Sequence, residues 1–446
     1  MELIKSISGI RGIVGKNLNN TIVNSYSNIF SHLQDQGDIL VARDSRPHGE
    51  DLYDSICDTL TFMGRNVISC GIIPTPTAQF IIKERNLAGG IVVTASHNPI
   101  EWNGLKFLDS DGCFLNADKM KELISMSPET ITIDRGNIIE SEDAYLSHID
   151  NVLNLQCIQS EKIKEKKFKV VIDTVNGAAY KALPELLEKL NCDIIKIHCE
   201  NTGDFPRGTE PIPSHLGDLS KTVRKEKADI GLATDPDADR LAIVSNTGFP
   251  IGEESTLVLV LESYLKFYKD SQTIVTNLST SMGIDAIAER YNSTVERSSV
   301  GEINVVEKMK ELGSAIGGEG NGGVILKESH LGRDSLVASA LVLNHLAHSN
   351  ISLDKILENI PRFVMIKDKI PIENDVNFND IKAHFKNDIA TFIDEDGLKI
   401  IWEDKWVHIR KSNTEPIIRI ISEANDNNTA ESLIDLINKI VSYSGP

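Results

Sequence analysis

The sequence has few cysteines, and they do not form the close pairs that are typical of zinc sites. No C-x-x-C pattern occurs among the six, which are Cys57, Cys70, Cys113, Cys157, Cys192 and Cys199. Zinc sites built from cysteine use such pairs, and disulfide frameworks belong mainly to short secreted chains. We therefore expect six reduced thiols and a cytoplasmic protein.

Long hydrophobic runs are missing as well. The longest apolar run, Leu257–Leu261, is far shorter than the roughly 20 residues that a membrane-spanning helix needs. The opening segment Met1–Ser6 does not place basic residues before an apolar stretch, as a secretion signal does. The sequence thus predicts neither a membrane span nor an export signal.

Positive charge is in deficit. The 446 residues include 46 Lys and Arg but 65 Asp and Glu, which gives a formal net charge of −19. Nucleic acids and anionic membranes both require a basic surface on the protein that binds them. We therefore expect neither as a partner. At roughly 100–200 residues per domain, the length predicts three or four domains.

Short β-branched runs alternate with helical patterns over most of the chain. The predicted strands include Ile39–Ala42, Ile91–Thr94, Val170–Asp173, Ile230–Thr234, Thr273–Thr276 and Ala315–Gly318. Helical patterns such as Ala179–Leu190 and Ile303–Leu312 lie between them, and this alternation predicts βαβ units with mostly parallel sheets. The pattern restarts near residues 39–110, 169–245 and 273–340, which indicates a threefold structural repeat.

The pattern changes after Pro361. We expect a strand at Phe363–Ile370, a helix at Val376–Phe392, a turn at Asp396–Gly397, strands at Trp406–Arg410 and Ile417–Ser422, and a helix at Ala430–Val441. This order is typical of a small α+β domain. The predicted fold is therefore three similar α/β domains and a smaller C-terminal domain, with boundaries at residues 1–148, 149–250, 251–361 and 362–446.

A first chemical loop, Thr94–Pro99, follows a predicted apolar strand. Pro99 stiffens it, and Ser96 stands where its hydroxyl can face a ligand, with His97 beside it. A hydrolase nucleophile elbow would have Gly two residues on either side of the serine, and here Thr94 and Asn98 occupy those positions. A capped turn is the alternative interpretation.

A second loop carries three aspartates, Asp235, Asp237 and Asp239, directly after the predicted strand Ile230–Thr234. Aspartates two residues apart in extended backbone project to one side, and Pro236 favours extended backbone at the residue before it. Adjacent carboxylates repel one another unless a cation lies among them. Hard oxygen ligands of this kind select Mg²⁺ or Ca²⁺.

Other acidic loops match this segment less well. An EF-hand would have Gly where Arg240 stands and Glu where Asn246 stands. A phosphatase of the haloacid dehalogenase type also places D-x-D after an apolar strand, but Thr or Val usually follows where Asp239 stands. A solvated acidic turn is the remaining alternative, and the density of carboxylates argues against it.

A third loop places Glu319 in the glycine-rich segment Gly317–Gly323. Glycines let a ligand approach the backbone closely. A single carboxylate in such a loop suits the hydroxyl groups of a sugar and would repel a phosphate. A flexible hairpin is the alternative.

A fourth loop, Arg410–Pro416, separates the last two predicted strands. It offers a guanidinium, two hydroxyls, an amide and several backbone N–H groups, a set that suits a dianionic phosphate. A polar turn is the alternative. Three further cationic positions, Arg11, Lys106 and the segment Arg43–Arg46, are each more often surface charges when taken alone.

Taken together, these loops resemble those of the α-D-phosphohexomutase superfamily, which includes phosphoglucomutases, phosphomannomutases and phosphoglucosamine mutases. The resemblance covers essentially the whole chain, and the order and spacing of the motifs match. The motifs are S-G-I-R-G at 8–12, T-A-S-H-N-P at 94–99, N-G-x-K at 103–106, D-P-D-A-D-R at 235–240, G-E-G-N-G-G at 318–323 and R-K-S-N-T-E-P at 410–416.

The resemblance implies four domains around a central cleft, each contributing one loop. It implies a phosphate carried on Ser96 and a Mg²⁺ ion held by an oxygen of that phosphoserine together with Asp235, Asp237 and Asp239. The substrate-binding residues would be Glu319, Asn321, Arg410, Ser412, Asn413 and Thr414. Arg11 and Arg240 would assist phosphoryl transfer, and Lys106 and His97 are the candidates for proton transfer.

The implied reaction interconverts hexose 6-phosphate and hexose 1-phosphate through a hexose 1,6-bisphosphate. The sugar loop departs from many bacterial members, because Asn321 and Gly323 stand where those have Ser and His. With the opening S-I-S-G-I-R-G, it is closest to a branch often labelled phosphoglucosamine mutase. We therefore expect glucosamine phosphate as substrate and a monomer or homodimer. The alternatives are a phosphomannomutase or phosphoglucomutase, a Mg²⁺-dependent phosphatase with Asp235 as nucleophile, and a catalytically silent regulatory protein.

Overall fold

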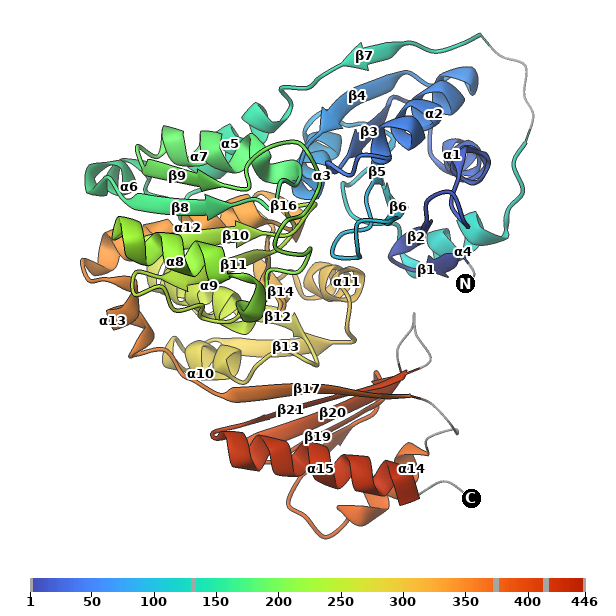
Figure 1. Cartoon of the computed structure of the whole chain (residues 1–446). Coiled ribbons are helices and arrows are strands. Elements are labelled where there is room, and N and C mark those ends of the chain that lie inside the picture. Colours follow the sequence, from blue (N-terminus) through green and yellow to red (C-terminus); the bar gives the residue numbers. More distant parts are fainter. Residues whose placement is uncertain (1–2, 130–133, 372–376, 412–416, 444–446) are drawn as a thin grey trace.

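The computed structural model describes residues 3–129, 134–371, 377–411 and 417–443. These residues form four β-sheets, one per domain (Figure 1). All six cysteines are unpaired. In the described part of the chain, no helix has the length and apolar character needed to cross a membrane.

Domain I contains a seven-stranded sheet of order β1-β2-β6-β5-β3-β4-β7. Its strands are β1 (Ile4–Ser6), β2 (Gly9–Ile13), β3 (Ile39–Arg43), β4 (Val67–Ile72), β5 (Gly89–Val93), β6 (Trp102–Leu108) and β7 (Ile138–Glu140). Its helices are α1 (Asn20–Leu33), α2 (Gly49–Phe62), α3 (Thr75–Glu84) and α4 (Ala117–Ser125). Apolar side chains cover both faces of the sheet.

Domain II contains a four-stranded sheet of order β11-β10-β8-β9. Its strands are β8 (Lys169–Asp173), β9 (Asp193–Ile197), β10 (Ile230–Thr234) and β11 (Leu241–Ser245). Its helices are α5 (Tyr145–Asn154), α6 (Ser160–Lys166), α7 (Ala182–Lys189) and α8 (Gly217–Glu226), with short 3₁₀ turns η1 (Ala178–Tyr180) and η2 (Pro213–His215).

Domain III contains a five-stranded sheet of order β13-β12-β14-β15-β16. Its strands are β12 (Thr273–Asn277), β13 (Thr294–Ser298), β14 (Ile316–Glu319), β15 (Gly323–Leu326) and β16 (His330–Arg333). Its helices are α9 (Glu253–Tyr268), α10 (Gly283–Arg290), α11 (Glu302–Leu312), α12 (Ser335–Ser349) and α13 (Leu353–Leu357). Helices α9 and α12 belong to one apolar core that continues into domain II, so the two domains pack as a unit.

The three domains repeat one arrangement of four strands. In β4-β3-β5-β6, β9-β8-β10-β11 and β13-β12-β14-β15, the first three strands are parallel and the fourth is antiparallel to the third. The Ser96 loop, the aspartate loop and the Glu319 loop each connect the third strand to the fourth. The predicted threefold repeat is therefore present, and it places the three loops at equivalent positions.

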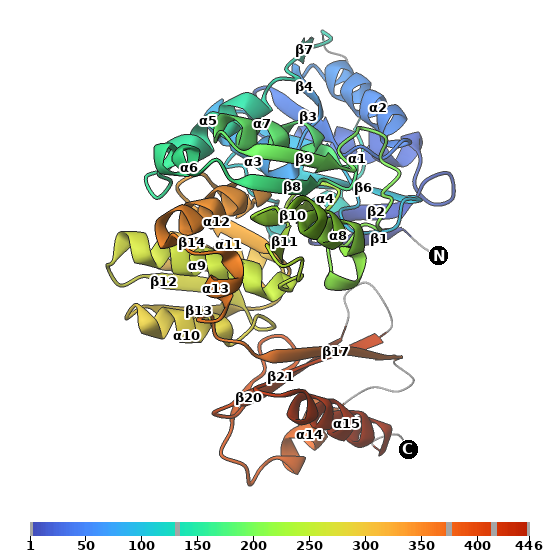
Figure 2. The same cartoon turned by 60° about the vertical axis from the view of Figure 1, so that its left-hand side comes forward.

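Domain IV is an antiparallel sheet of order β17-β21-β20-β19-β18. Its elements are β17 (Val364–Pro371), α14 (Phe378–His384), β18 (Thr391–Ile393), β19 (Leu398–Ile401), β20 (Lys405–Lys411), β21 (Ile417–Ala424) and α15 (Asn427–Tyr443). The sheet packs on α15 around its own apolar core and lies apart from domains I and II (Figures 1 and 2).

The predicted helix at Val376–Phe392 is wrong over its second half. Helix α14 ends at His384, and β18 pairs antiparallel with β19. The apolar spacing of Phe378, Ile381 and Phe385 continues to Ile389, which suggested a longer helix, but Ile389 is fully exposed. Pairing with β19 gives the Thr391–Ile393 segment backbone partners that outweigh the local helical pattern.

Candidate active site

The Ser96 loop begins where the buried strand β5 ends. Ser96 is 2% exposed and has a φ of +50°, a left-handed conformation that residues other than glycine rarely adopt. Its backbone N–H donates to the Thr94 hydroxyl at 2.9 Å, and that hydroxyl donates to Asp44 at 2.6 Å. The surrounding structure thus holds the serine in an unfavourable backbone conformation, as is common at functional sites.

Arg46 binds the backbone of the same loop. Its guanidinium donates to the carbonyl oxygens of Ser96 at 2.6 Å and Asn98 at 2.9 Å and pairs with Asp44 at 3.1 Å. Arg46 and Asp44 are completely buried, and Lys106 is 4% exposed. The interpretation of these residues as isolated surface charges is therefore wrong, because each one has a buried partner of opposite charge.

The three aspartates converge at the end of β10, where one oxygen from each carboxylate lies within 4.8 Å of the others. All three are buried. The expectation of extended backbone is wrong: the Ala238 N–H donates to the Asp235 carbonyl at 3.1 Å, and Ala238 has a φ of +60°. The carboxylates meet because the loop curls, and side-chain alternation along a strand is not the cause.

The three carboxylates differ in their ionisation. Burial, followed by the charges of Asp239 and Asp237, raises the pKa of Asp235 well above its ordinary value. Burial opposes ionisation of Asp237 too, but the Lys106 ammonium, 2.6 Å away, and the Thr75 hydroxyl, 2.8 Å away, lower its pKa. Burial is likewise outweighed at Asp239, where Arg333 lowers the pKa. Lys106 and Arg333 thus stabilise the ionised forms of Asp237 and Asp239, whereas burial beside these two charges disfavours the ionised form of Asp235.

The donor atoms of this loop suit a hard divalent cation. Oδ1 of Asp237 and Oδ1 of Asp239 are buried and make no hydrogen bond with any residue that the structure describes. The Ser96 hydroxyl lies 3.3 Å from Oδ2 of Asp235. Carboxylate oxygens that accept no hydrogen bond, beside a hydroxyl, are the ligands that Mg²⁺ prefers, although Nε of Arg240 lies 3.7 Å from Oδ1 of Asp239.

Cationic groups surround the serine and the aspartates. Arg240 donates to Nδ1 of His97 at 3.1 Å, and that nitrogen lies 3.4 Å from the Ser96 hydroxyl. Arg11 donates to Oδ1 of Asn98 at 2.8 Å. Burial and the charges of Arg240 and Arg11 lower the pKa of His97, whereas Asp237 and Asp239 outweigh burial and raise that of Lys106. His97 is therefore neutral, and Lys106 carries its proton.

Glu319 at the end of β14 is already surrounded by donors. Oε1 accepts from the Asn277 amide at 2.8 Å and the Gly301 N–H at 3.1 Å, and Oε2 accepts from Arg333 at 2.9 Å and the Asn321 amide at 3.3 Å. A carboxylate has about four acceptor positions. A sugar hydroxyl can therefore donate to Glu319 only by displacing a donor, and the longest contact is the one from Asn321.

The fourth loop lies between β20 and β21. Arg410 at its start is half-buried and lies 3.5 Å from Asp396, which accepts from the Val300 N–H at 2.9 Å. The end of β20 is therefore beside domain III. The predicted phosphate ligands Ser412, Asn413 and Thr414 lie outside the described residues.

Sequence models for all four domains of one family match this chain in order. The phosphoglucomutase/phosphomannomutase alpha/beta/alpha domains I, II and III match residues 3–131, 143–248 and 253–363, and the C-terminal domain matches residues 367–440. The chain belongs to the α-D-phosphohexomutase superfamily. The family resemblance and the fold class drawn from the sequence are therefore confirmed, and the protein is an enzyme, a phosphohexomutase.

Phosphohexomutases that are similar to it carry different sugar names. A phosphoglucomutase/phosphomannomutase of Thermococcus kodakarensis is 35% identical over 89% of this chain and 88% of its own length. A phosphoglucosamine/phosphogalactosamine mutase of Sulfurisphaera tokodaii is 32% identical over 97% of this chain and 98% of its own length. The structure of a phosphoglucomutase/phosphomannomutase family protein of Burkholderia thailandensis has a TM-score of 0.87 at 24% identity, with 99% of both chains covered.

Two arginines of this phosphohexomutase were not predicted as site residues. Arg46 was set aside as a surface charge, and Arg333, which contacts Asp239 and Glu319, was not singled out at all. Apart from Asp44, which pairs with Arg46 from two residues away, their partners lie at least 14 residues away in the sequence, so no local pattern points to them. The one signal in the sequence that bears on Arg333 is Gly323, because many bacterial members have a larger residue at that position.

Proposed function

We propose that this phosphohexomutase interconverts hexose 6-phosphate and hexose 1-phosphate through phosphoserine at Ser96, with glucosamine phosphate as its preferred substrate. The observation that carries the proposal is the buried Ser96 hydroxyl, 3.3 Å from Asp235 within the aspartate cluster. The proposed arrangement is a monomer or homodimer in the cytoplasm, with domain boundaries at 250/251 and 361/362. The boundary expected at 148/149 falls inside α5 (Tyr145–Asn154), which we assign to domain II.

The aspartate loop and the phosphoserine oxygen would hold Mg²⁺. When bound, that ion supplies positive charge to the phosphoryl oxygens. Lys106, fixed in its charged form between Asp237 and Asp239, and Arg11 and Arg240 supply further charge there. The residues of the chain thus form a preorganised positive environment for a phosphoryl group.

Two transfers complete the reaction. In the first, a free sugar hydroxyl attacks the phosphorus on Ser96, the bond from Oγ to phosphorus breaks, and a bisphosphate forms. The hydroxyl proton passes to Nδ1 of His97, which must first release its hydrogen bond from Arg240, and from there to Oγ of the departing serine. In the second, Oγ of Ser96 gives its proton to His97 and attacks the other phosphorus of the reoriented bisphosphate, the bond from that phosphorus to the sugar oxygen breaks, and the sugar oxygen takes the proton.

The phosphate on Ser96 is the first test. Mass analysis of the Ser96 peptide after incubation with hexose 1,6-bisphosphate should show added phosphate, and Ser96→Ala should neither take up phosphate nor turn over. A phosphatase that uses Asp235 as nucleophile would instead release inorganic phosphate and leave Ser96 unlabelled. Release without labelling would overturn the proposal.

The sugar is tested by kcat/KM measured side by side on glucosamine, glucose and mannose 1- and 6-phosphates. Support for glucosamine comes from the S-I-S-G-I-R-G opening, from the Asn321–Gly323 loop and from the name of the Sulfurisphaera relative. A higher kcat/KM for glucose or mannose phosphate would refute the preference and leave the reaction type standing.

A further inference from the structure

Arg333, the last residue of β16, binds three carboxylates through three different nitrogens. Nη2 lies 2.6 Å from Asp239, Nη1 lies 2.9 Å from Glu319, and Nε lies 2.9 Å from Glu302. Arg333 is 7% exposed and its partners are buried. One rigid guanidinium therefore joins the aspartate loop of domain II to the sugar loop of domain III.

We propose that Arg333 is a positioning residue that fixes the spacing between the metal-binding and the sugar-binding carboxylates. The inference rests on the proposed function, since it assigns Asp239 to the metal and Glu319 to the sugar. The guanidinium is planar and its donors have fixed directions, so the two carboxylates cannot shift independently while both are bound. A lysine has one compact head group and cannot reproduce this geometry.

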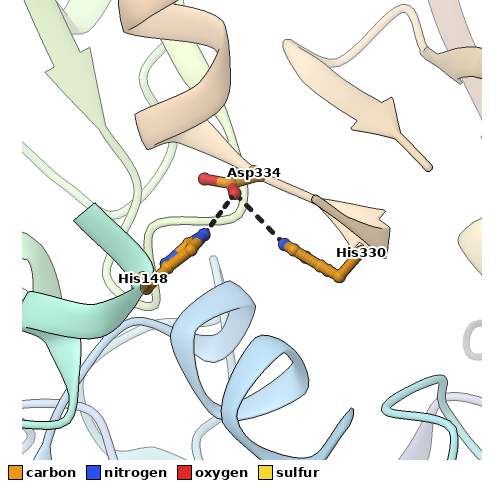
Figure 3. Close-up of side chains that lie close together, drawn as sticks. All are labelled: His148, His330 and Asp334. Carbon is orange, nitrogen blue, oxygen red and sulfur yellow. Dashed lines mark hydrogen bonds and ion pairs between the residues drawn. The ribbon is translucent and has the colours of Figure 1, made fainter. Parts of the chain in front are cut away.

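Two observations explain how Arg333 is itself held. The neighbouring residue Asp334 accepts from the first backbone N–H groups of α12 through Oδ1, and its Oδ2 lies 2.9 Å from His148 and 3.1 Å from His330 (Figure 3). His148 also contacts the Thr77 hydroxyl at 3.0 Å. Side chains from α3, α5 and β16 thus anchor the backbone at positions 333 and 334.

Gly323 provides the room that Arg333 occupies. A Cβ at position 323 would lie 2.2 Å from Cδ and 2.9 Å from Cγ of Arg333, so no other residue could stand there without displacing the arginine. The side chain of Arg333 can therefore take its observed position only because residue 323 is a glycine.

The position of Arg333 matters because Glu319 must exchange a donor when a sugar binds. Asn321 makes the longest of the four contacts to Glu319, whereas Arg333 makes a short ionic one. Arg333 can therefore keep the carboxylate oriented while a sugar hydroxyl replaces Asn321. Displacing groups near reacting atoms by about 1 Å can cost on the order of 100-fold in rate.

The test compares Arg333→Met with Arg333→Lys and Gly323→Ala. Arg290→Met, which removes a partly exposed pair with Glu262, and Gly217→Ala, which adds a Cβ in open space, are the controls. We expect kcat/KM to fall about 100-fold or more in Arg333→Met and Gly323→Ala, to recover little in Arg333→Lys, and to stay within threefold of wild type in both controls.

A binding measurement separates positioning from general disruption. Calorimetric titration of the unphosphorylated protein with Mn²⁺ should show equal or tighter binding in Arg333→Met, because a positive charge 2.6 Å from Asp239 is gone. Activity lost together with Mn²⁺ binding would overturn the proposal in favour of a purely structural role. Wild-type-like kcat/KM in Arg333→Met, in Arg333→Lys or in Gly323→Ala would also overturn it. If the wild type turned over none of the sugars, the proposed function itself would fail.

Discussion

Two lysines of domain I make ion pairs of equal length in different surroundings. Nζ of Lys106 lies 2.6 Å from Asp237, with both side chains at most 5% exposed, and Nζ of Lys119 lies 2.6 Å from Asp109, with its own side chain 39% exposed. Removing one partner of a buried pair costs about 3–5 kcal/mol, since the other charge stays buried and unpaired. An exposed pair contributes about 0.2–1 kcal/mol.

We therefore expect Lys106→Met to destabilise domain I several times more than Lys119→Met. Hydrogen exchange of peptides from β5 and β6, measured in EDTA, reports this domain without interference from the others. Mg²⁺ should then restore much of the loss in Lys106→Met, because it replaces the positive charge beside Asp237 and therefore binds the folded variant more tightly than the folded wild type. Lys119→Met should bind the ion as wild type does, so its loss relative to wild type should be the same with and without Mg²⁺.

Either of two outcomes would refute the expected difference between Lys106→Met and Lys119→Met. Equal losses of protection in the two variants would show that burial of the Lys106–Asp237 pair does not govern its energy. A large loss in Lys106→Met that Mg²⁺ leaves unchanged would show that the aspartates do not bind the ion, and the metal assignment would then fail with it.

Two further outcomes are expected. Asp237→Asn should lower kcat by more than about 100-fold with KM for the sugar phosphate within about threefold, in steady-state assays; equal kcat would contradict the metal assignment. Burial raises the pKa of Glu254 to about 7 from 4.5, so its stabilising contribution is present below pH about 4.5 and is lost as pH rises through 7. Glu254→Gln should therefore reduce the loss of domain III stability between pH 5 and 8 in urea unfolding; an unchanged loss would refute this.

The sequence predicted those features that depend on local pattern. The run Ile230–Thr234 is apolar except for its last residue and matches β10 without a shift, because a strand buried on both faces needs a largely apolar composition. The close spacing of the three aspartates likewise predicted a cluster of carboxylates, although the extended backbone expected there was wrong. The helix expected at Val376–Phe392 was wrong because a pairing with β19, outside the segment, decided its second half.

Features that depend on distant partners could not be predicted. Whether an arginine is buried is decided by its partners. Arg46 binds the carbonyl oxygen of Ser96 on another loop as well as the nearby Asp44, and the partners of Arg333 lie on other elements. The departure at Gly323 was visible in the sequence, but its cause required the coordinates of Arg333. A glycine in place of a larger residue is therefore a hint that another side chain fills the space.

The chain has a strong net negative charge, but the cations within the site offset the carboxylates next to them, and this allows a phosphorylated substrate to bind. The cations Arg11, Lys106, Arg240 and Arg333 face five carboxylates, those of Asp235, Asp237, Asp239, Glu302 and Glu319. Because the raised pKa of Asp235 favours its neutral form, the site is close to neutral by itself. A bound divalent cation would offset the charge of about −2 on the Ser96 phosphate, so the affinity for phosphosugar should depend on the metal even before any phosphoryl group moves.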